Sequence, residues 1–509
     1  MKHSTKLLLN TIASYGRIIV NTIVTLISTR LALKYLGADD FGLYNLIAGV
    51  VLMLSFFNGS LMISSQRYFS IAIGEGNKRK LDQYFNASLG IHIVISGIIG
   101  VALVAMMPFL FNGFLKIPEG REDVAIVVYL VMVFSAISTV ATIPFSAIMN
   151  AREDLVVLSL IDIVYCLGKL VAAVALLFVT QHLLVTYSVI MLMAVVLKML
   201  LEIAWSGRKY AEAKLQKQFL FDRHISREML GFVGWNTLGS VAVIVRNQGV
   251  AIALNVFFGT VVNAAYGIAH QVNALVLSFA STLTTVFTPM IIQAKGAGND
   301  KKMLESAILS SKLSFLLSSM MSLPILMFMK EILELWLSDF PKYTESFCVL
   351  TVYSFLIQQL YPGVNRAVYA TGKIKGYQIS LSIFLISIIP IGTALFYLGF
   401  PPISIMVVMI VSQVLTLLST VFFAWKYCNL DISEFLLKSI SLPVALFLLA
   451  ITLSGWIRQS LPSTISPSLM ILVSGILALL FSLCYFFIVL NRPERKSLIS
   501  IVANLRNHK

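Results

Sequence analysis

The sequence predicts an all-α, polytopic membrane protein with about 14 transmembrane helices. Hydrophobic residues make up 58% of the 509 residues and charged residues only 12%, and the mean hydropathy is +0.89. A soluble globular protein carries roughly 25% charged residues, so this chain could not cover its surface with polar groups in water. Its long apolar runs do not alternate every second residue, which favours helices over the strands of a membrane barrel.

Each expected helix is an apolar run about as long as the hydrocarbon core of a bilayer is thick. Short connections join these runs, and none of them is long enough to hold a soluble catalytic domain. In chain order, the predicted membrane spans are 8–34, 41–69, 84–113, 122–149, 155–179, 183–205, 229–257, 263–291, 304–329, 346–370, 377–399, 402–425, 437–457 and 468–490.

The distribution of Lys and Arg predicts the orientation of the chain. With the N-terminus inside, 24 of the 38 basic residues fall on the cytoplasmic side and 6 fall on the opposite side. Cytoplasmic segments of membrane proteins carry such an excess of positive charge, so we expect both termini in the cytoplasm. The net charge of +15 then reflects topology and contact with anionic lipids, and we expect no nucleic-acid partner.

An internal repeat at a constant offset of 222 residues predicts two similar halves. It pairs Gly37 with Gly259, and the loop Gly-x-Gly-Asn-x-x-Lys occurs at both 74–80 and 296–302, where we expect a tight turn between helices. Six helices per half is an even number, so the repeat is of the parallel type. The expected parts are an N-terminal six-helix lobe (1–205), a basic cytoplasmic linker (206–228), a C-terminal six-helix lobe (229–426), and two extra helices with a basic cytoplasmic tail (427–509).

Polar residues inside the predicted helices mark a candidate binding cavity, because such residues are costly to insert into lipid. In the first helix, one polar stripe recurs at helical spacing and consists of Asn10, Ser14, Arg17, Asn21, Thr25 and Ser28. The first two helices of each half are two-faced in this way, as expected of helices that line a wet cavity. The predicted cationic residues of the cavity are Arg17, Arg246, Lys169 and Arg30, and its predicted polar lining is Asn21, Asn58, Asn247, His270 and Asn273.

Asp162 is the one clearly intramembrane acid, and Lys169 follows it by seven residues, or about two helical turns. We expect the two side chains to pair directly or through an intermediate group, either as a structural ion pair or as part of ion coupling. Lys198, Lys312 and Arg67 lie nearer to helix ends, and we interpret them as side chains that extend to the membrane surface.

Positive charge outweighs negative charge among these residues, so the cavity should hold an anion. Arginine suits phosphate because its planar fork donates two hydrogen bonds at once, and the neighbouring hydroxyls and amides suit a sugar. The sequence has no ATP-binding loop, no nucleophile–base pair and no metal-ligand spacing among its 4 cysteines. We therefore expect a transporter rather than an enzyme, with no cofactor.

Two stretches of the sequence resemble a known family. The first contains Asn10-Thr, Thr29-Arg-Leu-Ala-Leu-Lys-Tyr-Leu-Gly37 and Phe41-Gly-Leu-Tyr-Asn-Leu46. The second contains Asn150-Ala-Arg-Glu-Asp154, Leu158-Ser-Leu-Ile-Asp-Ile163 and Gly168-Lys-Leu170. Both are similar to the polysaccharide transporters, which are Wzx-type O-antigen flippases of the multidrug/oligosaccharidyl-lipid/polysaccharide superfamily with a MATE-like fold.

This resemblance implies two six-helix lobes, two additional C-terminal helices, and a cavity lined by the first two helices of each half. It implies that an oligosaccharide on undecaprenyl pyrophosphate is moved by alternating access from the cytoplasmic to the outer leaflet, for lipopolysaccharide and surface polysaccharide synthesis. Arg17 and Arg246 would contact the pyrophosphate–sugar head. The expected location is the bacterial cytoplasmic (inner) membrane, and the expected partners are this lipid-linked oligosaccharide, membrane lipids, a coupling ion (H⁺ or Na⁺) and polysaccharide assembly proteins.

Two other functions stay open at this point. An ion-coupled multidrug antiporter of the same superfamily would handle cationic drugs with carboxylates in one lobe, and only Asp162 would be available for that role. A membrane-embedded polysaccharide polymerase or ligase would need paired catalytic groups on a long outer loop, whereas the predicted outer loops are short.

Overall fold

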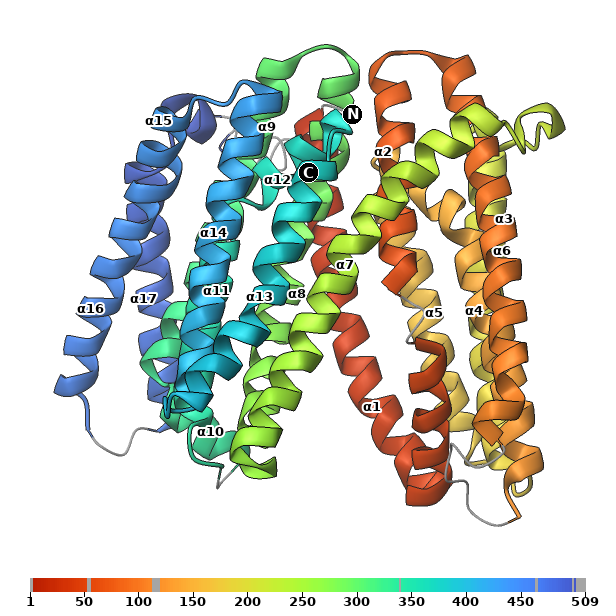
Figure 1. The fold of residues 1–509 in the computed structure, drawn as a ribbon, viewed down its shortest axis with the longest axis horizontal. Coiled ribbons are helices and arrows are strands. Elements are labelled where there is room, and N and C mark those ends of the chain that lie inside the picture. The colour runs from red at the N-terminus through yellow and green to blue at the C-terminus, as the bar shows by residue number, and fades with distance from the viewer. Residues whose placement is uncertain are drawn as a thin grey trace. The chain divides into compact units, whose positions relative to one another are not determined.

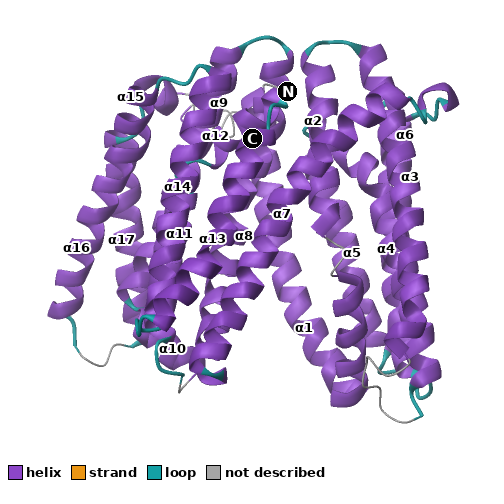
Figure 2. Cartoon of the chain, in the orientation of Figure 1, coloured by secondary structure: helices purple, strands orange, loops and turns teal. Residues whose placement is uncertain are grey.

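The computed structural model describes residues 3–52, 56–111, 120–337, 340–462, 466–496 and 499. Every regular element in these residues is a helix, and no strand occurs among them (Figure 2). The all-α fold class predicted from the sequence is therefore confirmed.

The chain divides into two compact units, which we call the first unit (Leu9–Thr237) and the second unit (Leu238–Lys509 with Met1–Leu8). Helix α7 (Arg223–Phe258) contains the boundary between them (Figure 1). The first part of the chain forms α1 (His3–Leu52), α2 (Phe56–Gly74), α3 (Lys78–Phe109), α4 (Glu122–Ala151), α5 (Leu155–Ala175), α6 (Leu183–Lys209) and the short helices η2 (Ala211–Ala213) and η3 (Lys217–Phe219). The second forms α8 (Thr260–Gly296), α9 (Asp300–Met327), α10 (Met329–Leu337), α11 (Thr344–Gln358), α12 (Pro362–Thr371), α13 (Lys375–Tyr397), α14 (Ile403–Cys428), α15 (Ile432–Phe435), η4 (Leu436–Ser441), α16 (Leu442–Ser460) and α17 (Pro467–Ile488).

In the described ranges, 12 helices are long and apolar enough to cross a membrane, and the bent pair of α11 and α12 is a thirteenth candidate. The remaining predicted span, 41–69, includes residues 53–55, which lie outside the described part, and is represented by the end of α1 and by α2. The chain is a multi-pass helical membrane protein, as predicted.

One predicted helix is broken in the structure. The sequence predicts a single span over 346–370, but α11 ends at Gln358 and α12 begins at Pro362, with a bend of 47° between them. Proline has no N–H to donate to the preceding turn, and its ring would clash with the carbonyl there. Pro362 is tolerated in the first turn of α12, where the helix leaves N–H groups without partners in any case.

The repeat is present in the backbone as well as in the sequence. Gly37 in α1 has φ 78° and ψ 171°, and Gly259, directly before α8, has φ 83° and ψ −179°. Only glycine adopts this region without strain, so both corners require it. The polar loop is the expected tight turn in both halves: Asn77 and Asn299 each accept a hydrogen bond from the backbone N–H three residues later, at 3.0 and 2.9 Å.

The predicted linker, residues 206–228, packs against the first unit. The Asn86 side chain on α3 accepts a hydrogen bond from the Gln216 N–H at 2.7 Å and donates one to the Lys214 carbonyl at 3.3 Å. Asn86 is buried, so these bonds satisfy an amide that would otherwise lack partners. The segment is thereby fixed on α3.

The two extra helices, α16 and α17, pack on α9 of the second unit (Figure 1). The Lys312 side chain on α9 is 1% exposed, and its Nζ lies 2.9 Å from Oε1 of Glu494, which follows α17. The Tyr485 hydroxyl on α17 donates a hydrogen bond to the Lys312 carbonyl at 2.9 Å. The interpretation of Lys312 as a side chain that extends to the membrane surface is wrong, because a carboxylate from the C-terminal tail neutralises it inside the protein.

Candidate functional site

A cavity of about 600 Å³ lies inside the first unit and is lined by residues from α1 to α6. This volume is typical of a small-molecule site. The polar stripe predicted on the first helix reaches the cavity through Thr25 and Ser28. Asn58 on α2 also lines it, and the buried Oδ1 of that residue has no hydrogen-bond partner. Of the predicted polar lining residues, Asn58 is the one that lines this cavity.

Among the described residues that line the cavity, Lys169 on α5 is the only charged one. Its Nζ lies 4.9 Å from the ring centroid of Tyr165. The rings of Tyr44 and Tyr187, also in the lining, meet edge-on with centroids 5.0 Å apart. An ammonium group beside tyrosine rings and hydroxyls can bind an anion that carries hydroxyl groups, and it repels a cation.

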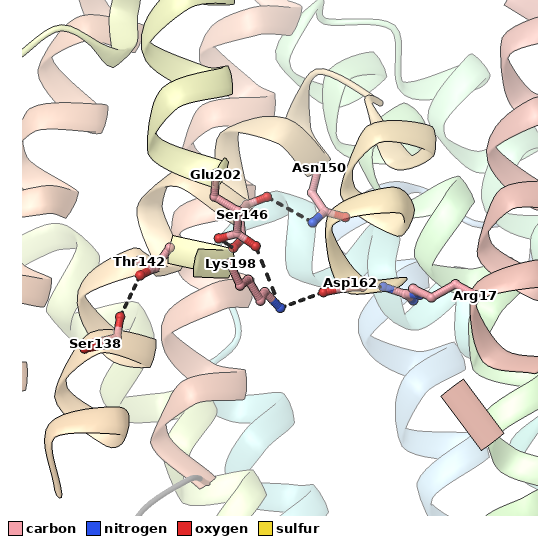
Figure 3. Close-up of polar contacts among 8 residues, drawn as sticks. All are labelled: Arg17, Ser138, Thr142, Ser146, Asn150, Asp162, Lys198 and Glu202. Carbon is pink, nitrogen blue, oxygen red and sulfur yellow. Dashed lines mark hydrogen bonds and ion pairs between the residues drawn. The ribbon is translucent and has the colours of Figure 1, made fainter. Parts of the chain in front are cut away.

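A network of charged side chains lies just beyond the cavity-lining residues of α5 and α6, and about two helical turns from those of α1. Asp162 on α5 accepts hydrogen bonds from Arg17 on α1 at 2.5 Å and from Lys198 on α6 at 2.6 Å (Figure 3). On each of these helices the charged residue lies nearer to the predicted cytoplasmic end than the cavity-lining residues do. One carboxylate, 20% exposed, thus joins three helices at that side of the cavity.

The charge network continues to Glu202 on α6, whose side chain is 0% exposed. Ser146 on α4 donates a hydrogen bond to Glu202 Oε2 at 2.5 Å, and Lys198 Nζ lies 3.7 Å from Oε1 (Figure 3). The network therefore contains two cations and two carboxylates, and its side chains come from four helices of the first unit.

The second unit contains a cation without a carboxylate partner among the described residues. Nε and Nη2 of Arg246 on α7 donate to Asn247 Oδ1 at 3.0 and 2.8 Å. Tyr266 and Tyr361 lie near enough to interact with it electrostatically, and the His270 ring centroid is 6.0 Å from that of Tyr266. Because a neutral amide satisfies only part of the guanidinium, its charge remains available to an anion.

The other predicted site residues are not among those that line the cavity of the first unit. Asn21 and Arg30 are exposed on α1, and neither is among its lining residues. Asn273 is half-buried on α8, where its Oδ1 is buried without a hydrogen-bond partner.

A direct pair of Asp162 with Lys169, one of the two forms predicted, is not found. Asp162 pairs with Arg17 and Lys198, and Lys169 forms no ion pair within the part of the chain that the structure describes. Spacing along one helix could not show this, because the partners come from two other helices. The interpretation of Lys198 as a surface-directed side chain is also wrong, and its i,i+4 spacing to Glu202 was the available signal.

The turn between α4 and α5 holds further ion pairs at the predicted cytoplasmic end of the first unit. Asp154 accepts hydrogen bonds from Lys209 Nζ at 2.6 Å and from the Tyr210 hydroxyl, and Arg152 Nη2 lies 2.5 Å from Oε1 of Glu212. Burial favours the neutral form of Asp154, but the hydrogen bonds outweigh it and hold the pKa of Asp154 below its usual value.

No protein-family model and no curated protein matches the sequence. Solved structures match the fold: a structure of MATE in the bent conformation has a TM-score of 0.72 at 14% identity, over 87% of this chain and 100% of that chain. The chain has the MATE fold. The cavity of the first unit and the charge network are described from the side chains of this chain alone.

Two more solved structures share the MATE fold. An outward-facing multidrug resistance MATE family transporter of the MOP superfamily has a TM-score of 0.71 at 14% identity, over 85% of this chain and 96% of that chain. The other is a MOP superfamily transporter from Pyrococcus furiosus, described as having a binding pocket of reverse polarity that suggests a different function. It has a TM-score of 0.71 at 14% identity, over 85% of this chain and 96% of that chain. At this identity the fold alone is shared, so the substrate has to be argued from the residues of this chain.

Proposed function

We propose that this protein is a flippase that moves an oligosaccharide linked to undecaprenyl pyrophosphate from the cytoplasmic to the outer leaflet of a bacterial inner membrane. The MATE fold supports membrane transport. The observation that carries the proposal is the charge of the cavity, whose described lining includes Lys169 and no acid. Such a cavity favours an anionic head group over a cationic drug.

In this proposal the substrate competes with Asp162. Arg17 and Lys198 both bind that carboxylate in the structure. A phosphate accepts hydrogen bonds from arginine in the same bidentate geometry as a carboxylate does. The pyrophosphate would therefore take the place of Asp162 on Arg17, while the sugars contact the tyrosines of the cavity and the polyprenyl chain stays in lipid.

A membrane potential that is negative inside favours the outward step by ~2.3 kcal/mol per charge per 100 mV. The same potential also favours the return of a positively charged, empty site, because that step moves positive charge toward the negative side. The proposal also includes coupling to H⁺ or Na⁺, with Asp162 as the acceptor.

One observation favours a second candidate, an ion-coupled multidrug antiporter. Asp162 is an intramembrane carboxylate with a 20% exposed side chain, so a proton, Na⁺ or a cationic drug can reach it. One of the solved MATE structures is that of a multidrug resistance transporter. In this alternative, Asp162 itself would bind the coupling ion or the drug.

The deciding experiment replaces Lys169 by Gln and by Arg in the native host, with Lys214→Gln on the exposed linker as the control. Surface polysaccharide, lipid-linked precursor, drug tolerance and membrane level of the protein are measured together. For a flippase, Lys169→Gln loses surface polysaccharide and accumulates precursor on the cytoplasmic side, while Lys169→Arg keeps partial function.

The same assays applied to alanine and lysine variants of Arg17 and Arg246 test the two arginines. Normal surface polysaccharide in every variant, together with altered drug tolerance, would overturn the flippase and leave the antiporter.

A further inference from the structure

We infer that the first unit carries a binding site for an anionic phospholipid between α5 and α6, at the predicted cytoplasmic surface of the membrane. A groove of about 410 Å³ lies between these two helices. Its apolar walls are formed by Val157 and Ile161 on α5 and by Leu201 and Ala204 on α6. None of the residues that line this groove lines the cavity of the first unit, so the two sites are separate.

The polar end of the groove fits a phosphodiester. Arg208 and Lys209, the last residues of α6, lie there. The charge of Lys209 is already balanced, because its Nζ lies 2.6 Å from Asp154. Arg208 is exposed and forms no ion pair with any residue in the described ranges. The uncompensated charge of the groove is therefore a guanidinium, which can donate two hydrogen bonds to one phosphate.

Trp205 lies at the junction between the polar end and the apolar walls. Trp205 is 38% exposed, and Lys209 Nζ lies 5.1 Å from the centroid of its ring. Indole rings are enriched at the level of the lipid head groups, where the acyl chains of a phospholipid join its phosphate-bearing head group. From Trp205 the groove continues along α6 to Leu201, toward the middle of the membrane.

These features together select one occupant. Basic pockets between membrane helices on the cytoplasmic side bind anionic head groups, and the apolar walls take one acyl chain. A zwitterionic lipid would bring its own positive charge toward Arg208, whereas phosphatidylglycerol adds only negative charge. The site therefore distinguishes lipids by head group rather than by chain.

The test uses the full chain with Trp205 as its only tryptophan, reconstituted in phosphatidylcholine vesicles. Bromine-labelled phosphatidylglycerol or bromine-labelled phosphatidylcholine is added at the same small fraction, and quenching of Trp205 fluorescence is measured. One favourable ionic contact at the membrane surface corresponds to about a fivefold preference for the anionic lipid. The matched control keeps only Trp425, which is 51% exposed near the end of α14 and lies beside Lys426.

Four outcomes decide the inference. Trp205 should show the head-group preference, Arg208→Gln should reduce it to the value of the Trp425 control, and Arg208→Lys should retain part of it. Ala204→Phe should fill the groove and weaken quenching by both lipids. Equal quenching of Trp205 by the two lipids, a preference unchanged in Arg208→Gln, or quenching that Ala204→Phe leaves as strong as before, would overturn the site.

Discussion

Gly37 and Gly259 turn the chain through the same backbone conformation at the same position of two halves, with φ values of 78° and 83°. A Cβ at either glycine would meet no atom within 4 Å, so the constraint is conformational rather than steric. The two corners are therefore equivalent despite the divergence of the helices around them.

Replacing either corner glycine by alanine should destabilise the protein by about 1–3 kcal/mol, the usual cost of a non-glycine residue in this region. Thermal unfolding in detergent measures the effect. Gly267→Ala is the control, because Gly267 lies inside α8 with open space around it and alanine is tolerated in a helix. If Gly37→Ala and Gly267→Ala unfold at the same temperature, the corner is not strained.

Asp162→Asn should destabilise the first unit, because it leaves Arg17 and Lys198 close together without their shared carboxylate. We expect about 1–3 kcal/mol, less than for a fully buried pair, since the side chains are partly exposed. The double variant Arg17→Gln/Asp162→Asn should lose less than the sum of the single variants in thermal unfolding. Strict additivity would show that the Arg17–Asp162 contact contributes nothing.

Asp154→Asn should destabilise the protein near neutral pH and not in acid. The folded pKa of Asp154 is lowered, so its contribution is complete above the unfolded value of about 3.9 and is lost as pH falls through the lower folded pKa. We expect roughly 1–2 kcal/mol from the lost charged hydrogen bonds, measured as unfolding temperature against pH. Asp82→Asn on α3 is the control, and a difference that persists at the lowest pH would contradict this account.

Glu494→Gln should be among the most destabilising single changes, because it leaves Lys312 charged and buried without a partner. Breaking a buried pair in this way costs about 3–5 kcal/mol. The double variant Lys312→Met/Glu494→Gln should recover most of the loss, since an apolar side chain fits a buried position. Glu305, an exposed acid on α9 like Lys312, supplies the control Glu305→Gln for thermal unfolding. Equal effects of Glu494→Gln and Glu305→Gln would contradict the prediction.

The membrane helices and the repeated turn could be predicted from the sequence because both depend on local patterns. Apolar length defines a span, and a glycine followed by a capping asparagine defines the turn at Asn77 and Asn299. The bend before Pro362 also has a local cause, and the proline was visible in the sequence. Its effect was missed because membrane helices often contain proline without breaking.

The partners of charged residues could not be predicted, because they depend on how helices are rotated against one another. Lys198 and Lys312 look alike in sequence, each a single lysine near the end of an apolar run. Lys198 pairs with Asp162 within the first unit, whereas Lys312 pairs with Glu494, which follows the last membrane helix. Lys169 and Asn58 were predicted to lie in a cavity because they are polar side chains inside membrane spans. That cavity was expected to be lined by the first two helices of each half, whereas the one that contains Lys169 and Asn58 is lined by α1 to α6, which depends on how these helices pack.

The pairing of Lys312 with Glu494 has a consequence for biosynthesis. The two residues are 182 positions apart, and a ribosome that adds about 5–20 residues per second needs roughly 10–40 s to make the second after the first. During that time the nascent α9 lacks the carboxylate that neutralises Lys312 in the folded chain, so this ion pair forms only after Glu494 has been synthesised. A chain that terminates before Glu494 would therefore leave the Lys312 ammonium buried without this carboxylate.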